Sequence, residues 1–123
     1  MKAMFVNEDG GVHYALAIVR GYKPWETRTK NMLSQLIGER VAVVRTRRGK
    51  TPTVIGYVTV RDSRHFNGKY LDENRDKTLI PKGSKYDVNG WAKWVYILED
   101  PEPCEPYPLP ENAIRHGRSW CEF

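Results

Sequence analysis

The chain has 123 residues and a mass of 14.3 kDa, and its formal net charge is +5. Its 40% hydrophobic and 28% charged residues exclude a disordered chain and predict one globular domain, 1–123. The longest apolar run, Ala15–Val19, is far too short to span a membrane. No apolar signal segment follows Met1, so we expect a cytoplasmic protein without a membrane partner.

The positive charge lies in the body of the chain. Residues 1–98 hold 18 Lys and Arg against 9 Asp and Glu, whereas residues 99–123 hold 2 against 6. A basic body interspersed with aromatic residues favours a polyanionic partner, above all nucleic acid. A solvated basic surface without a partner is the alternative.

The cysteines and histidines give no sign of a metal. Cys104 and Cys121 have no metal-ligand spacing, and two free thiols are expected in a reducing compartment. His13, His65 and His116 are scattered along the chain. We therefore expect neither a metal site nor a cofactor.

The first elements are a strand and a helix. Ala3–Val6 is predicted as an edge strand. After a turn, apolar residues recur at i, i+3, i+4 and i+7 from Val12 to Val19, which predicts a helix of about three turns. Asp9 is placed to cap its start and Gly21 to end it in a left-handed conformation. The alternation of residues 14–18 would also suit a strand.

A second short helix is predicted after residue 30. Asn31 is placed to cap it, Leu33, Leu36 and Ile37 would form its inner face, and Gly38 would end it.

Two β-rich runs follow, Val41–Arg47 and Thr53–Val60, separated by a turn that contains glycine and proline. This pattern predicts a β-hairpin. Gly56 inside the second run indicates a bulge or a close approach of another backbone.

The rest of the chain alternates between polar segments and strands. Residues 61–90 are predicted as a long excursion with one short helix, and Trp94–Leu98 as a strand. The proline-rich residues 101–110 predict an extended loop without regular pairing, and Ser119–Phe123 a closing strand. We expect a mainly β fold with small helices (α+β), its sheet rolled into a barrel that hides its edges.

Three charged residues surround a tryptophan directly after the first helix. If Trp25–Arg28 is extended, Glu26 and Arg28 lie on one face and are displayed together, while Trp25 and Thr27 lie on the other, with Trp25 toward the core. A bend at the preceding proline would bring Lys23 beside the pair. The alternative is an ordinary exposed ion-pair cluster of little energetic value.

The pattern Gly21-x-Lys23-x-x-Glu26-x-Arg28 resembles the G-x-K-x-x-E-x-R signature of ASCH domains, which belong to the PUA-like superfamily. Residues 61–90 match the family poorly. The resemblance implies a β-barrel flanked by short α-helices, with a cleft in which the motif faces RNA or a nucleotide. The resemblance extends in chain order over Ala15–Arg20, Ile55–Val60, Trp91–Asp100 and the terminal strand with Trp120.

The first functional hypothesis is an RNA- or nucleotide-binding domain whose motif lines a basic cleft. If the hairpin forms, arginines gather at one of its ends, where they would contact phosphates. Trp91 follows a glycine in polar surroundings and is the expected exposed stacking platform. The expected ligand-binding residues are Gly21, Lys23, Glu26, Arg28, Arg45, Arg47, Arg48, Arg61 and Trp91.

The second hypothesis is a hydrolase. Some small bacterial ASCH proteins are amidohydrolases that remove the acetyl group from acetylcytidine, with a threonine nucleophile where this chain has Glu26. Lys23 matches the family's lysine, but Thr27 would face away and cannot replace the nucleophile. Glu26 would instead act as a general base on water while Lys23 polarises the carbonyl. Glu73 is a candidate for the distant acid. A ribonuclease, with Lys23 and Arg28 stabilising a phosphorane, is a further alternative, and whether the protein is an enzyme stays open.

A third hypothesis is a protein-interaction module. The acidic, proline-rich residues 99–106 would dock on a partner in an extended conformation. The alternative, a loop that only spans to the last strand, is favoured.

Overall fold

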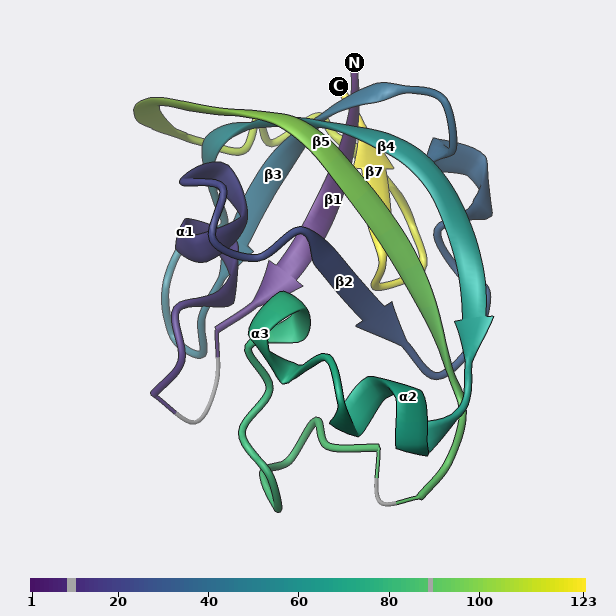
Figure 1. Ribbon diagram of the computed structural model, residues 1–123. Coiled ribbons are helices and arrows are strands. Elements are labelled where there is room, and N and C mark those ends of the chain that lie inside the picture. Colours follow the sequence, from purple (N-terminus) through teal and green to yellow (C-terminus); the bar gives the residue numbers. More distant parts are fainter. Residues whose placement is uncertain (9–10, 89) are drawn as a thin grey trace.

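The computed structural model describes residues 1–8, 11–88 and 90–123 (Figure 1). Its strands form one seven-stranded sheet with the order β2-β5-β4-β3-β1-β7-β6. The strands are β1 (Lys2–Asn7), β2 (Trp25–Arg28), β3 (Arg40–Thr46), β4 (Thr53–Phe66), β5 (Lys93–Pro108), β6 (Ile114–His116) and β7 (Trp120–Glu122). The helices are α1 (Tyr14–Val19), the 3₁₀ turn η1 (Ser34–Leu36), α2 (Gly68–Asp72) and α3 (Arg75–Thr78). The mainly β prediction with short helices is confirmed.

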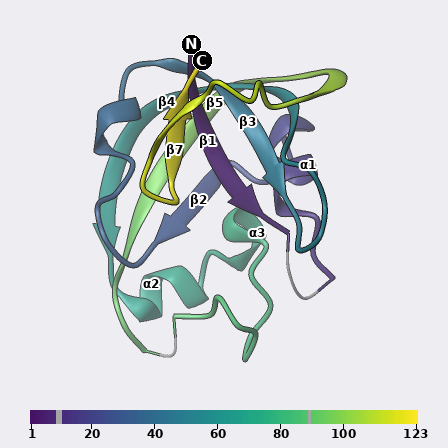
Figure 2. The same cartoon turned by 180° about the vertical axis from the view of Figure 1, so that it is seen from behind.

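The sheet is open rather than a closed barrel, so the predicted barrel is not confirmed. Within the described residues, β2 and β6 occupy the two ends of the strand order and do not pair with each other. The sheet is nevertheless strongly curled, because β4 and β5 are long and their register shifts at three places. The curl brings β2 across β1, where Arg28 Nη2 donates to the Phe5 carbonyl at 2.6 Å (Figures 1 and 2).

β1 lies in the interior of the sheet, so the prediction of an edge strand was wrong. It pairs in parallel with β3 and antiparallel with β7. Residues 3–6 are all buried, and alternate side chains enter different clusters: Met4 and Val6 pack with α1, whereas Ala3 and Phe5 pack on the opposite face. A strand that is apolar on both faces is typical of a sheet interior.

The predicted hairpin forms between β3 and β4, and Gly56 has both predicted features. The β3–β4 register shifts between Val43 and Val44, opposite this glycine. A Cβ atom on Gly56 would lie 2.7 Å from Val19 Cγ1 and 2.4 Å from the Glu102 carbonyl oxygen. Only a residue without a side chain lets α1 and β5 pack this closely on β4.

Two segments predicted as irregular are strand. Residues 61–66 belong to β4, and most of the proline-rich segment belongs to β5, which pairs with β4 as far as Pro108. β2 covers only residues 94–97 of β5. Beyond that point one edge of β5 faces solvent, and a proline, which cannot donate a backbone hydrogen bond, is tolerated at a sheet edge or bulge.

α1 forms as predicted but is shorter than three turns, because it begins only at Tyr14. His13 occupies its N-cap position, and Asp9, the predicted cap, lies outside the described residues. Gly21 has φ 83° after the helix, which confirms the left-handed stop.

The second predicted helix is reduced to the 3₁₀ turn η1. Asn31 does not cap it, because its side-chain oxygen accepts a hydrogen bond from Tyr96 Oη at 2.6 Å. Leu33 and Leu36 are buried as predicted, whereas Ile37 is exposed.

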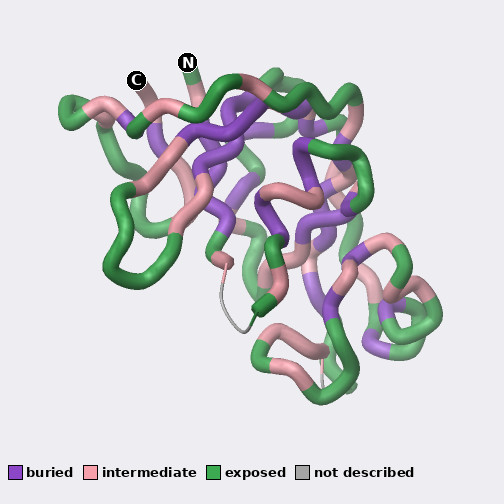
Figure 3. Tube along the Cα trace, turned by 90° about the vertical axis from the view of Figure 1, so that its left-hand side faces the viewer, coloured by how far each residue is buried: buried purple, intermediate pink, exposed green. Residues whose placement is uncertain are grey.

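Buried residues are concentrated in the strands of the sheet (Figure 3). Trp25 is buried against Leu71 and Val95, as its predicted orientation requires. α2 and α3 lie below β2 (Figure 1), so that this edge strand is covered by the segment between β4 and β5. No helix among the described residues is long and apolar enough to cross a membrane.

Candidate functional site

A cavity of about 510 Å³ opens where β2 crosses the end of β1. Its walls come from β1, β2 and the segments on both sides of it, β3, α1, the segment between α3 and β5, the start of β5, and the β6–β7 hairpin. Five basic residues and one carboxylate line it, namely Lys23, Arg28, Lys93, Arg115, Arg118 and Glu26.

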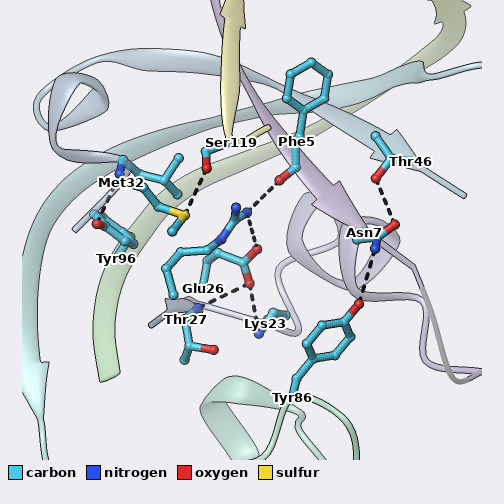
Figure 4. A network of polar contacts seen from close by, with 12 residues as sticks. Phe5, Asn7, Lys23, Glu26, Thr27, Met32, Thr46, Tyr86, Tyr96 and Ser119 are labelled. Atoms are coloured by element: carbon cyan, nitrogen blue, oxygen red, sulfur yellow. Dashed lines mark hydrogen bonds and ion pairs between the residues drawn. The ribbon is translucent and has the colours of Figure 1, made fainter. Parts of the chain in front are cut away.

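β2 places the motif residues at the floor of this cavity. Its extended backbone puts Glu26 and Arg28 on one face, and Arg28 Nη2 lies 3.0 Å from Glu26 Oε2. Lys23 Nζ lies 3.6 Å from Glu26 Oε1, and Figure 4 shows the two side chains facing each other. The predicted convergence of the three charges is thus observed. Glu26 is only 7% exposed, so the Glu26–Arg28 pair is buried rather than displayed on the surface.

Lys23 connects the cavity floor to the covering helices. It is 1% exposed, and its ammonium group donates to the carbonyls of Trp25 (2.8 Å) and Thr78. With Glu26 these two carbonyls account for its three N–H donors. Burial lowers the pKa of Lys23, an effect that the neighbouring carboxylate opposes. The lysine therefore ties β2 to the end of α3.

Glu26 is held in its ionised form. Burial alone would raise the pKa of this carboxyl, but the charges of Arg28 and Lys23 outweigh burial and lower it. The peptide N–H of Thr27 also donates to Glu26 Oε1 at 3.3 Å. An ionised carboxylate only accepts hydrogen bonds, so this group can receive N–H or O–H donors of a ligand.

The lowered pKa of Glu26 predicts a defined acid sensitivity. A carboxyl whose folded-state pKa lies below its ordinary value of 4.5 stabilises the fold above that value, and the contribution is lost as the pH falls through the folded-state pKa. We therefore expect the ¹³C carboxyl resonance of Glu26 to titrate below pH 4.5. A midpoint for Glu26 above 4.5 would contradict the ion-paired site.

The cavity also has an aromatic wall. The rings of Tyr14 and Tyr86 meet edge to face with centroids 5.8 Å apart, and Asn7 Nδ2 donates to Tyr86 Oη at 3.3 Å. The ammonium group of Lys93 donates to the Tyr86 carbonyl, and burial lowers the pKa of this lysine. Rigid aromatic side chains of this kind suit a planar ligand.

The other predicted binding residues lie outside the cavity. Gly21 lies against Pro101, and Arg45 is ion-paired with Glu8. The remaining four residues are exposed, namely Arg47 and Arg48 on the β3–β4 turn, Arg61 beside Glu99, and Trp91, which is 78% exposed as expected.

Two residues discussed for the hydrolase differ from expectation. Thr27, expected to face away from Glu26, also lines the cavity. Glu73, the candidate distant acid, is exposed at the end of α2 and does not line it.

Sequence reasoning missed Lys93, Arg115 and Arg118, and with them the aromatic pair. One signal for the two arginines was available: the acidic segment 99–123 contains no other arginine and no lysine. No comparable signal marked Lys93, because its position depends on the pairing of β5 with β4. In the described part of the chain no cluster of His, Cys, Asp and Glu could hold a metal ion, and both cysteines are free.

Comparison with known proteins shows which solved structures share this fold. No protein-family model and no curated protein matches the sequence. The structure is similar to the crystal structure of ASCH from Zymomonas mobilis, at 21% identity and a TM-score of 0.68, covering 87% of this chain and 73% of that chain. One single-site mutant of that protein matches at 21% identity and a TM-score of 0.68, covering 89% of this chain and 77% of that chain. A second single-site mutant matches at 22% identity and a TM-score of 0.67, covering 87% of this chain and 74% of that chain. The resemblance drawn from the motif is confirmed at the level of the fold: this chain has the fold of an ASCH domain.

Proposed function

We propose that this protein is an RNA- or nucleotide-binding domain of the PUA-like type, which takes one nucleotide unit into the cavity. The observation that carries the proposal is the meeting of Lys23, Glu26 and Arg28 at the floor of a cavity in which five cations face one carboxylate. An excess of positive charge in a concave site favours an anionic ligand.

The size of the cavity suits a nucleotide. Its volume of about 510 Å³ lies within the range of small-ligand sites, roughly 300–1,000 Å³. The wall formed by Tyr14 and Tyr86 offers apolar surface to a base, and Glu26 and Arg28 offer an acceptor and a donor to its polar edge. A single unstacked nucleotide meets these groups, whereas a duplex does not fit into such a space.

The hairpin arginines and Trp91 are proposed to contact RNA outside the cavity. Arg45, Arg47, Arg48 and Arg61 lie outside the cavity, so they stay predicted contacts for phosphates of an RNA strand that extends beyond the bound nucleotide. Trp91 stays the predicted stacking platform for a neighbouring base.

Calorimetric titration tests the proposal directly. At low salt we expect the protein to bind ribonucleoside monophosphates or short single-stranded RNA, and Arg28→Met to weaken binding by about tenfold or more, because it removes a charged donor from the floor. The matched control is Arg20→Met, an exposed arginine outside the cavity. Circular dichroism confirms that both variants are folded. Absence of binding by the wild type at low salt would refute the proposal.

A hydrolase remains the second candidate, and one observation favours it. Lys23 is a buried lysine with a lowered pKa inside a cavity, and such groups cluster at catalytic sites. Two observations oppose it: the donors of Lys23 are already occupied, and the lowered pKa of Glu26 makes this carboxylate a weak general base. Binding is therefore the better supported function.

Product analysis separates the two functions. Acetylcytidine and RNA are incubated with the wild type and with Lys23→Ala, and the products are followed by mass spectrometry. Binding without catalysis predicts unchanged substrate in every sample. Turnover by the wild type that is lost in Lys23→Ala would establish the hydrolase instead.

A further inference from the structure

We propose that Arg115 and Arg118, termed here the rim arginines, form a phosphate subsite, so that the cavity selects phosphorylated nucleotides over nucleosides. The inference rests on the proposed nucleotide-binding function and specifies its ligand class. Both rim arginines come from the β6–β7 hairpin and line the same cavity as the motif residues of β2.

The rim arginines have no anionic partner in the described protein. Neither makes an ion pair with a described residue, and the carboxylate of their own hairpin, Glu122, is paired with His116 at 3.1 Å. The guanidinium of Arg115 lies 5.0 Å from the centre of the Phe5 ring, a cation–π contact that does not use its N–H donors. The donors of both arginines are therefore available to a ligand.

Phe5 fixes the rim arginines relative to the cavity floor. Its peptide N–H donates to the Ser119 carbonyl at 3.0 Å, next to Arg118, and its own carbonyl accepts from Arg28 at 2.6 Å. The Ser119 hydroxyl also contacts Met32 Sδ at 2.9 Å (Figure 4). One residue of β1 thus connects the hairpin turn to the Glu26–Arg28 pair, which sets a fixed separation between the two ends of the site.

The charges of the cavity divide between these two ends. At the floor, Glu26 balances part of the charge of Lys23 and Arg28. At the rim, no carboxylate among residues 1–8, 11–88 and 90–123 balances the two guanidinium groups in this way. Guanidinium groups bind phosphate oxygens in a bidentate geometry. A ligand with a neutral polar edge at one end and a phosphate at the other meets both ends, and a nucleotide has this form.

Calorimetric titration with the four ribonucleosides and their 5′- and 3′-monophosphates tests the inference. We expect a monophosphate to bind at least about tenfold tighter than its nucleoside. Arg115→Gln/Arg118→Gln should weaken monophosphate binding by about tenfold in total and weaken nucleoside binding far less, because a nucleoside has no phosphate for the rim arginines to bind. Arg118→Gln alone should show about half of this effect on a logarithmic scale. This single variant keeps the Arg115–Phe5 contact, so its weaker binding cannot be caused by loss of that contact. The control is Arg20→Gln/Lys69→Gln, with the same charge change on exposed residues outside the cavity.

The outcomes distinguish this inference from the proposed function. Equal affinities for nucleosides and monophosphates, or an equal loss in the control variant, would overturn the phosphate subsite while leaving nucleotide binding intact. No binding of any of these ligands or of short RNA would overturn both. Titration with a dinucleotide identifies the source of the phosphate. If the dinucleotide binds more tightly than the monophosphate, the subsite binds a phosphate within an RNA strand. If the monophosphate binds more tightly, the subsite binds a free nucleotide or an RNA end.

Discussion

Replacing Glu26 by glutamine is expected to lower the free energy of unfolding by about 3–5 kcal/mol, which is a large part of the stability of a small domain. The carboxylate lies between Lys23 Nζ and Arg28 Nη2, at 3.6 and 3.0 Å. The neutral amide would leave two cations together at a buried site without a counter-charge. Urea denaturation monitored by tryptophan fluorescence measures the loss, with Glu105→Gln as the control, because this exposed glutamate makes no ion pair with a described residue.

A double-mutant cycle identifies the cause of this loss. Lys23→Met gives up the ion pair with Glu26 and the hydrogen bonds to the Trp25 and Thr78 carbonyls, but it keeps the Glu26–Arg28 pair. No buried charge is then left without a counter-charge, so we expect it to cost less than Glu26→Gln. The Lys23→Met/Glu26→Gln double variant should recover part of the stability, since the unbalanced lysine charge is gone. A loss below about 1 kcal/mol for Glu26→Gln, or no recovery in the double variant, would contradict a buried ion-pair cluster.

The stability of the Glu26→Gln variant should also depend on pH. In Glu26→Gln, Lys23 remains buried, and burial already lowers its folded-state pKa below the ordinary value of 10.5. The unfolded state then binds more protons than the folded state, so stability rises as the pH increases toward 10.5. The charge of Glu26 raises the pKa of Lys23 in the wild type, so without it this pKa is lowered further. The stability difference from wild type should therefore shrink in alkaline solution, as the lysine of the variant becomes neutral.

Gly56→Ala is the second large expected effect, a loss of about 3 kcal/mol, at the upper end of overpacking costs. The added Cβ would lie 2.4 Å from the Glu102 carbonyl oxygen and 2.7 Å from Val19 Cγ1. The first contact is with backbone, and it cannot be relieved without disturbing the pairing of Tyr57 with Glu102. Thermal and urea denaturation measure the change.

Gly49→Ala is the control for this substitution. Gly49 lies in the β3–β4 turn with φ 74°, and a Cβ atom added there would meet nothing within 4 Å, so only the left-handed conformation is penalised. We expect a loss of about 1 kcal/mol there. Equal losses in the two alanine variants would show that helix α1 and strand β5 move apart easily, against the close packing at Gly56.

Local sequence patterns predicted the elements whose formation depends on near neighbours. The turn residues between the two β-rich runs predicted the β3–β4 hairpin, and Gly21 predicted the end of α1. The alternation of a strand placed Glu26 and Arg28 on one face, and the spacing brought Lys23 to the same carboxylate. These relations span a few residues, so backbone geometry is sufficient to establish them.

Long-range pairing decided what the patterns predicted wrongly. Residues 3–6 resemble an edge strand in isolation, but burial on both faces requires neighbours, which are β3 and the distant β7. The proline-rich part of β5 lacks the donors of an ordinary strand, yet it is strand because β4 pairs with it on one side only. In both cases tertiary contacts outweighed local preference.

The sequence by itself determined that a lysine, a glutamate and an arginine share one small region of an ASCH-like fold. Only the tertiary structure decided that the region is the floor of a cavity, and that Arg115 and Arg118, about 90 residues further along the chain, line its rim. The physical reason is the curl of the sheet, which brings β2 across β1. The hydrogen bonds of Phe5 to Arg28 and to Ser119 then hold β2 and the β6–β7 hairpin on opposite sides of the same cavity.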